Sequence, residues 1–312
     1  MTILEQITER FPVRRSAKQK ADFRKWVMGQ MAQLGYRPRV EENGNGKHHN
    51  VVCGSPDTAQ ITFTAHYDTP ACIGLPNLMI PRNWPVYFAY QLLIIVILLA
   101  IALAGGTVLG LITGSDVMLR VGLVGVYFLE LMFMLHGPAN KNNVNDNTSG
   151  VAAILETMAK IPPEQRSRVA FILFDNEEKG CQGSKAYAKD HLQVQHVKLV
   201  VNLDCVGVGE HFIVSSPKLA RGMEEYELLE RVLAAREGRT AHFFSSATTR
   251  GNSDYRSFKC GVGISAYRMA SGVGFYTGDI HTGRDTQADQ GNIDYLSGAL
   301  SACVEQLPQE DA

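Results

Sequence analysis

The sequence predicts an α/β fold in which helices flank a mostly parallel, mixed central sheet, with a two-helix transmembrane hairpin inserted into it. Three observations support this prediction. Short apolar runs rich in β-branched residues alternate with segments of helical periodicity, as in a layered α/β domain. Acidic residues and histidines follow several of these runs, where strands would deliver them to one edge of a sheet. One stretch of 30 residues without a formal charge, Val86–Ser115, interrupts the alternation.

The segment before this stretch contains one predicted helix and two predicted strands. Ser16–Leu34 has apolar residues near helical spacing, and a glycine and Pro38 follow it closely. The sequence EENGNGKHHN (41–50) is typical of a turn or hairpin. NVVCG (50–54) and ITFTAHYD (61–68) are short apolar runs rich in β-branched residues, which predicts strands.

The segment after the apolar stretch continues the alternation. NDNTSG caps a predicted helix that runs to about Lys160, and Pro162 with Pro163 ends it. Strands are predicted at VAFILFD, VKLVVNLD, HFIVSS and GVGISAYRM, and helices at 185–191, Glu224–Arg236 and Ile293–Gln306.

Two apolar segments joined by the polar turn TGSD predict a helical hairpin that enters and leaves a bilayer on one side. The first, Val86–Ser115, exceeds the roughly 20 residues that a spanning helix needs. The second, Val117–Leu135, is interrupted by Arg120, which lies close enough to the turn to reach the interface, and by the deeper Glu130. The expected domains are a discontinuous α/β domain, 1–82 plus 137–312, and a hairpin, 83–136. A buried helical pair or an apolar dimer interface is the alternative to a membrane span.

The distribution of charges predicts the orientation of this hairpin. Arg82 precedes it and Lys141 follows it, whereas the turn at its far end carries Asp116. The positive-inside rule then places the catalytic domain and both termini in the cytoplasm, with a multi-pass anchor in the cell membrane. The N-terminal residues lack the apolar core of a secretory signal.

The composition is consistent with an intracellular enzyme domain. The chain has 312 residues, of which 45% are hydrophobic, and its formal net charge of −1 gives no electrostatic basis for binding nucleic acid. The six cysteines are scattered without a CxxC pair, which favours buried, unpaired thiols in a reducing compartment.

Candidate metal ligands lie in five groups, each at the end of an apolar run or in a turn rich in glycine. They are His66 and Asp68 in TAHYDTP, Asp146 in NDNTSG, Glu177 and Glu178 in FDNEEKG, Asp204 in VNLDCVG, and His281 in DIHTGRDT. Histidine and carboxylate side chains are the ligands that a catalytic zinc ion takes. Two histidines and three carboxylates, with an extra glutamate, could bind a pair of zinc ions that hydrolyses an amide.

The residue types also suggest separate roles within this set. Asp68 lies two residues after His66 in an extended chain, so it could accept a hydrogen bond from the imidazole nitrogen that does not bind metal. Asp146 has two carboxylate oxygens and could bridge two ions. Of the adjacent glutamates Glu177 and Glu178, one could bind metal while the other takes a proton from water.

The motifs resemble, in order, those of the M28 family of zinc aminopeptidases, which have a co-catalytic two-metal site. The matching segments are HYDTP, NDNTSGVAAILE, EEKGCQGS, NLD, NSDYRSF and a late histidine. The resemblance covers nearly the whole chain except the hairpin. It implies that His66 and Asp204 hold one zinc ion and that Glu178 and His281 hold the other. It further implies that Asp146 bridges the two and precedes a strained peptide bond.

The resemblance also implies that Glu177 is the general base and that Asp68 orients the first histidine ligand. The chain departs from the family pattern at the position before His281, where Ile280 replaces a tyrosine. Tyr276 is the candidate oxyanion donor in its place. The long insertion after HYDTP is a second departure.

The function expected from these features is a membrane-anchored di-zinc aminopeptidase acting on peptides, including membrane-associated ones. One alternative is a glutaminyl-cyclase-like aminoacyltransferase on the same scaffold. Another is a non-catalytic membrane receptor or scaffold. The lipid bilayer is an expected partner, and a homo-oligomer formed through the hairpin remains a further alternative.

Overall fold

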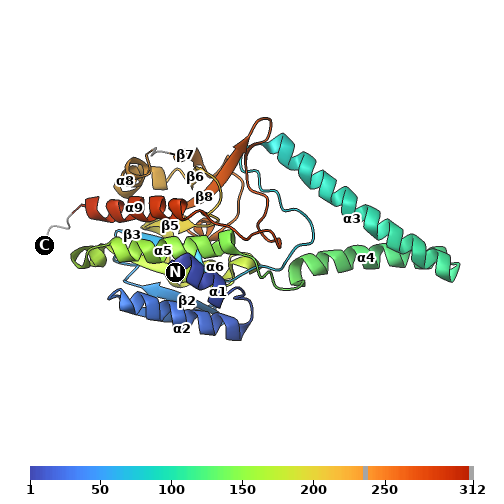
Figure 1. Ribbon diagram of the computed structural model, residues 1–312, viewed down its shortest axis with the longest axis horizontal. Helices are drawn as coiled ribbons and strands as arrows, with labels where there is room; N and C mark the ends of the chain where they lie inside the picture. Colours follow the sequence, from blue (N-terminus) through green and yellow to red (C-terminus); the bar gives the residue numbers. More distant parts are fainter. Residues whose placement is uncertain (235–237, 309–312) are drawn as a thin grey trace.

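A mixed sheet between two layers of helices forms the body of the protein, which confirms the predicted α/β fold (Figure 1). The computed structural model describes residues 1–234 and 238–308. Within them the strand order is β1-β2-β4-β3-β5-β8-β6-β7, and β9 pairs with β8. The strands are β1 (Pro38–Asn43), β2 (His48–Cys53), β3 (Ile61–His66), β4 (Val169–Phe174), β5 (Leu199–Leu203), β6 (His211–Ser216), β7 (Thr240–Ser245), β8 (Gly261–Ala270) and β9 (Gly274–Tyr276).

The centre of the sheet is parallel. Strand β3 runs parallel to both β4 and β5, and β5 runs parallel to β8. Antiparallel pairs flank this centre, at β1–β2, β2–β4 and β6–β8. Strands β3, β4 and β5 are buried along their full length, as expected of parallel strands covered by helices on both faces. Their carboxyl ends therefore meet at one edge of the sheet.

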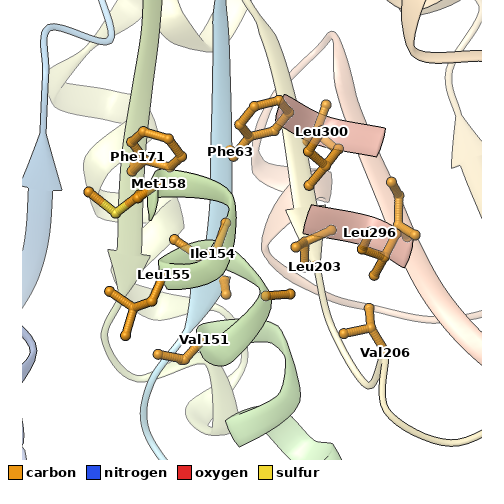
Figure 2. Packing of buried hydrophobic residues seen from close by; sticks show 14 of the residues in the cluster. Phe63, Val151, Ile154, Leu155, Met158, Phe171, Leu203, Val206, Leu296 and Leu300 are labelled. Atoms are coloured by element: carbon orange, nitrogen blue, oxygen red, sulfur yellow. The ribbon is translucent and has the colours of Figure 1, made fainter. Parts of the chain in front are cut away.

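Helices cover both faces of the sheet. The described α-helices are α1 (Ile3–Arg10), α2 (Ala17–Gln33), α3 (Trp84–Thr113), α4 (Asp116–His136), α5 (Gly150–Lys160), α6 (Gln182–Asp190), α7 (Leu192–Val197), α8 (Glu224–Val232) and α9 (Gln290–Gln306). Of these, α3 and α4 do not cover the sheet but project from the body (Figure 1). On one face, α5 and α9 bury apolar side chains such as Ile154 and Leu300 against Phe63 of β3 (Figure 2). Each fully buried side chain of this kind contributes about 1.5–3 kcal/mol. On the other face, Tyr187 of α6 packs against Phe174 of β4.

Most predicted elements are present, and the differences lie in short or marginal segments. Helix α2 begins after Ser16, whose side chain accepts a hydrogen bond from the backbone N–H of Gln19. Helices α1 and α7 and strands β1, β7 and β9 were not among the predicted helices and strands, although β1 and β2 form a hairpin at the turn predicted for 41–50. Helix α8 ends at Val232, and residues 235 and 236 of the predicted helix Glu224–Arg236 lie outside the described residues.

Two helices long and apolar enough to cross a membrane, α3 and α4, project together from the body of the protein (Figure 1). Only 17% and 6% of their most apolar windows are buried within the chain, so they are not a buried helical pair. Gly114, in the left-handed conformation with φ of 63°, ends α3 at the tip. Both carboxylate oxygens of Glu130 in α4 are buried without a hydrogen-bond partner.

Glycines allow α3 and α4 to pack closely where they cross. A Cβ atom on Gly106 would lie 2.6 Å from the carbonyl oxygen of Leu119, and one on Gly122 would lie 2.9 Å from the Cα of Gly106. Close approach of two backbones at small residues is the usual basis of helix association in membranes. The tight crossing therefore depends on the absence of side chains at these two positions.

We predict that Gly106→Ala destabilises the hairpin by roughly 1–3 kcal/mol, because the added methyl group overlaps a backbone atom of the partner helix. Gly125→Ala is the matched control, since a Cβ atom there meets nothing within 4 Å. Thermal unfolding of both variants in mild detergent measures the difference. Equal unfolding of the two variants would contradict the described crossing.

Candidate metal centre

The candidate metal ligands meet at the carboxyl edge of the parallel strands, where α/β sheets bind ligands. His66 is the last residue of β3, and Asp204 directly follows β5. Glu177 and Glu178 lie in a single 3-10 turn after β4. The other two candidates come from loops: Asp146 precedes α5, and His281 precedes α9.

These residues form two groups that share one carboxylate. In the first group, Nε2 of His66 lies 3.3 Å from Oδ1 of Asp146 and 3.6 Å from an oxygen of Asp204. In the second, Nε2 of His281 lies 2.9 Å from Oδ2 of Asp146 and 3.4 Å from an oxygen of Glu178. The ligand atoms of each group lie within 4.8 Å of one another. The two oxygens of Asp146 thus face different groups, as a bridging carboxylate requires.

Unsatisfied polar atoms show that these residues fit a pair of cations. Nε2 of His66, Oε1 of Glu178 and Oδ1 of Asp204 are all buried without a hydrogen-bond partner. Buried polar atoms of this kind cost about 1–3 kcal/mol each unless a partner satisfies them. Two imidazoles and several carboxylates are a donor set that suits zinc, so the fold has a place for the implied metal.

The pKa values of His66 and Asp146 are strongly perturbed. Burial lowers the pKa of His66, but the facing carboxylates, Asp146 foremost, outweigh burial and hold this pKa well above its usual value. Burial raises the pKa of Asp146, yet the facing imidazoles of His281 and His66 outweigh burial and lower it. Protons on the imidazoles therefore balance the anionic carboxylates, and binding of cations would displace those protons.

The pKa values of the two glutamates are both raised. Burial is the main cause that raises the pKa of Glu177 and of Glu178 well above the usual value, and neighbouring carboxylates add to the effect. Oε1 of Glu177 accepts a hydrogen bond from the thiol of Cys181 at 3.3 Å. A buried carboxyl group with a raised pKa holds a proton more readily than an exposed one, as a residue that takes up a proton requires.

Asp68 connects the first histidine to the glutamate turn. Its Oδ1 lies 3.5 Å from Nδ1 of His66, on the side of the ring away from Asp146. Its two oxygens also accept the backbone N–H groups of Glu177 at 2.9 Å and Glu178 at 3.3 Å. The sequence suggested the contact with the imidazole, while the hydrogen bonds that hold the glutamate turn become visible only in the structure.

Two further charged residues support the site and were not found by sequence reasoning. Arg14 is fully buried, and it donates hydrogen bonds to the carbonyl of Tyr67 at 2.5 Å and to the hydroxyl of Thr148 at 3.0 Å. Burial lowers the pKa of Arg14 to about 10, so it stays charged at neutral pH. No local sequence pattern marks this residue.

Asp285 fixes the backbone segment that carries Asp146, the carboxylate shared by the two donor groups. It accepts the backbone N–H groups of Asn145 at 2.7 Å and of Asp146 at 3.0 Å, and the next peptide bond, Asp146–Asn147, is cis. Burial raises the pKa of Asp285 to about 7. This residue lies four positions after His281 in DIHTGRDT, so its position in a noted motif was the available signal.

A cavity of about 250 Å³ opens beside the two groups. Asp146, Glu177 and His281 line one side of it, and side chains of β6 and β8 line another. The structure places Tyr276 in a different pocket, with Pro76 and Tyr90. Tyr255 and Tyr267 line the cavity itself.

A comparison with protein-family models gives a match over residues 133–300 to "Peptidase family M28". The chain belongs to peptidase family M28. The matched M28 region includes Asp146, both glutamates, Asp204 and His281, whereas His66 and Asp68 precede it. Family membership supports a peptide hydrolase. No curated protein matches the chain significantly.

Solved structures share the same fold. Glutaminyl cyclase of Porphyromonas gingivalis has a TM-score of 0.59 and 13% identity, over 98% of this M28 chain and 96% of that chain. The aminopeptidase LapA of Legionella pneumophila also has a TM-score of 0.59, with 14% identity over 99% and 69% of the chains. A leucine aminopeptidase precursor of Bacteroides thetaiotaomicron has a TM-score of 0.58 and 14% identity, over 98% and 95%. At these identities the likeness concerns the fold alone.

We predict that Arg14→Met costs about 2 kcal/mol or more of folding free energy and weakens zinc binding, because Tyr67 and Thr148 lose a buried partner. Arg24→Met is the control, since Arg24 bonds to the hydroxyl of the same Tyr67 from a partly exposed position. Urea unfolding and zinc titration against a chelator measure the two effects. If Arg14→Met is as stable in urea and binds zinc as tightly as Arg24→Met, the supporting role of Arg14 is contradicted.

Proposed function

We propose that this M28 protein is a membrane-anchored di-zinc aminopeptidase that removes N-terminal residues from peptides. The observation that carries the proposal is the pair of donor groups around one shared carboxylate. Glu177 lies beside them, with its ligand atom within 4.8 Å of those of His66 and Glu178. His66 and Asp204 would hold one zinc ion, and Glu178 and His281 the other, with Asp146 between them. Zinc bound in such a site supplies Lewis-acid activation of water and of the scissile carbonyl.

Glu177 is the residue that moves the proton in this proposal. Asp68 fixes its backbone N–H group, and the thiol of Cys181 contacts its carboxylate, so the side chain is held at the cavity wall. It accepts a proton from the attacking water and returns it to the leaving amine, a step that typically contributes 10²–10⁴-fold. Asp68 keeps His66 in one orientation through the other ring nitrogen.

The proposed architecture is a peptidase domain in two parts, 1–82 and 137–312, around a transmembrane hairpin, 83–136. Arg82 and Arg15 lie at the two ends of the hairpin nearest the body, and Trp84 and Tyr87 lie in the first turn of α3. Basic and aromatic residues at this level are typical of the cytoplasmic membrane interface. The catalytic domain and both termini would then be cytoplasmic, beside a bilayer that presents membrane-associated peptides. A homo-oligomer through the exposed apolar helices is the competing role for the hairpin.

Glutaminyl-cyclase-like chemistry is the competing reaction, because solved cyclases have this fold. The two complete donor groups favour hydrolysis with a pair of metals over intramolecular aminolysis. A non-catalytic receptor is disfavoured because every ligand and the base are present. The test is an assay of the zinc-supplemented protein on peptides with varied N-terminal residues, glutamine among them, and a blocked-amine control. Release of free N-terminal amino acids supports the proposal, whereas pyroglutamate formation alone would refute it.

We predict that Glu177→Gln retains zinc but loses about 10²–10⁴-fold in kcat, because the amide cannot take up the proton. Asp146→Ala should instead deplete both zinc ions, because each donor group loses a ligand. Elemental analysis combined with peptide hydrolysis separates the two variants. Wild-type turnover in Glu177→Gln, or unchanged metal content in Asp146→Ala, would contradict the assigned roles.

The membrane proposal predicts that the full chain stays in the pellet after alkaline carbonate extraction of membranes and is released only by detergent. The apolar surfaces of α3 and α4 require a lipid or detergent environment, since most of both helices is exposed. A variant lacking residues 83–136, joined by a short linker, is the control and should be soluble. Recovery of the full chain as a soluble dimer without detergent would favour the dimer interface instead.

A further inference from the structure

Arg250 lies where the candidate metal cavity meets the first turn of α3. It lines that cavity together with Asp146 and Glu177, and it also lines an adjacent pocket with Tyr87. Its backbone N–H donates to the carbonyl of Pro81, just before the hairpin, at 2.9 Å. One side chain is thus in contact with both the membrane helix and the substrate cavity.

Three aromatic rings of α3 hold the guanidinium group in place. Its Cζ lies 3.9 Å from the ring centroids of Trp84 and of Tyr87, and 4.9 Å from that of Phe88. Stacking of this kind uses the flat faces of a guanidinium group. It leaves the N–H groups, which lie in the plane, free to donate hydrogen bonds.

These donors have no hydrogen-bond acceptor among residues 1–234 and 238–308. The Nε atom of Arg250 is buried without a hydrogen-bond partner, and its side chain makes no ion pair within residues 1–234 and 238–308. The neighbouring Arg256 differs, because it donates to the backbone carbonyls of Gly251 and Thr249. Arg250 can therefore donate hydrogen bonds to an anionic ligand, whereas Arg256 already donates its hydrogen bonds to backbone carbonyls.

The charges and the volume of the cavity indicate which ligand would suit Arg250. Among the described residues that line it, Arg250 is the only lysine or arginine, and the carboxylates of the candidate metal site line the same cavity. A substrate carboxylate would be repelled by those acids and attracted by this guanidinium group. The volume of about 250 Å³ is below the roughly 300 Å³ at which pockets for drug-sized ligands begin, so the cavity suits a short peptide.

We propose that Arg250 is a specificity residue that binds a carboxylate of the substrate on the C-terminal side of the scissile bond. The inference rests on the proposed aminopeptidase function and adds a substrate class to it. That class is short peptides, dipeptides above all, whose free carboxylate reaches Arg250 while the N-terminal residue lies at the metal groups. The aromatic rings of α3 give the hairpin a part in specificity, because they set the position of the guanidinium group.

The test compares matched substrates within each variant of the full-length, zinc-loaded protein in detergent. The N-terminal residue is the one that the wild type cleaves fastest, and the substrates are a dipeptide and its C-terminal amide. The wild type should favour the free acid by about 10–100-fold in kcat/KM, mostly through KM. In Arg250→Gln this ratio should fall toward one, whereas the control Arg256→Gln should keep it. Trp84→Leu should reduce the ratio while leaving the arginine in place.

Two further measurements identify which carboxylate binds and separate binding from turnover. A pair of dipeptide amides ending in aspartate or asparagine distinguishes a side-chain carboxylate from the terminal one. Calorimetric titration of Glu177→Gln, and of the double variant with Arg250→Gln, compares binding of the acid and the amide without turnover. If no peptide is hydrolysed but the acid binds more than tenfold tighter through Arg250, the proposed function fails, whereas the carboxylate-binding role of Arg250 stands. Equal binding of acid and amide, or a ratio unchanged in Arg250→Gln, overturns it.

Discussion

The buried carboxylate of Asp146, shared between two donor groups, is the constraint on which the rest of the structure depends. Its two oxygens face the imidazoles of His66 and His281, and further buried carboxylates surround them. Gathering so many acids away from water is unfavourable unless cations or protons balance them. The protein therefore needs both a positive charge at the centre and a scaffold stiff enough to hold the acids in place.

The scaffold consists of parallel strands tied together by charged side chains. Strands β3, β4 and β5 bring His66, the glutamate turn and Asp204 to one edge because parallel strands end together. Asp68 links the first strand to the turn after the second through two backbone hydrogen bonds. On the loop side, Arg14 and Asp285 fix the segment around Asp146. Each tie spans more than 100 residues of sequence.

The hairpin is tied to the same segments that form the metal centre. Arg15, next to the buried Arg14, donates a hydrogen bond to the carbonyl of Gly137 at the end of α4. The chain leading into α3 contacts the segment that ends at His281. The backbone N–H of Ile73 donates to the carbonyl of His281 at 2.7 Å, and Met79 forms a β-bridge with Thr277. Both ends of the hairpin are therefore hydrogen-bonded to segments that lie next to the cavity.

The sequence by itself determined the alternation of strands and helices, the two apolar helices and the residues that could bind metal, because each has a local pattern at a strand end or in a turn. The tertiary structure alone decided how these residues group around Asp146 and which distant side chains support them. Arg14 and Arg250 carry no local signal, since their partners lie far away in sequence. Tyr276 lies near His281 in the chain, yet the pairing of β9 with β8 places it in another pocket. Proximity in space depends on strand pairing and register, which local periodicity does not encode.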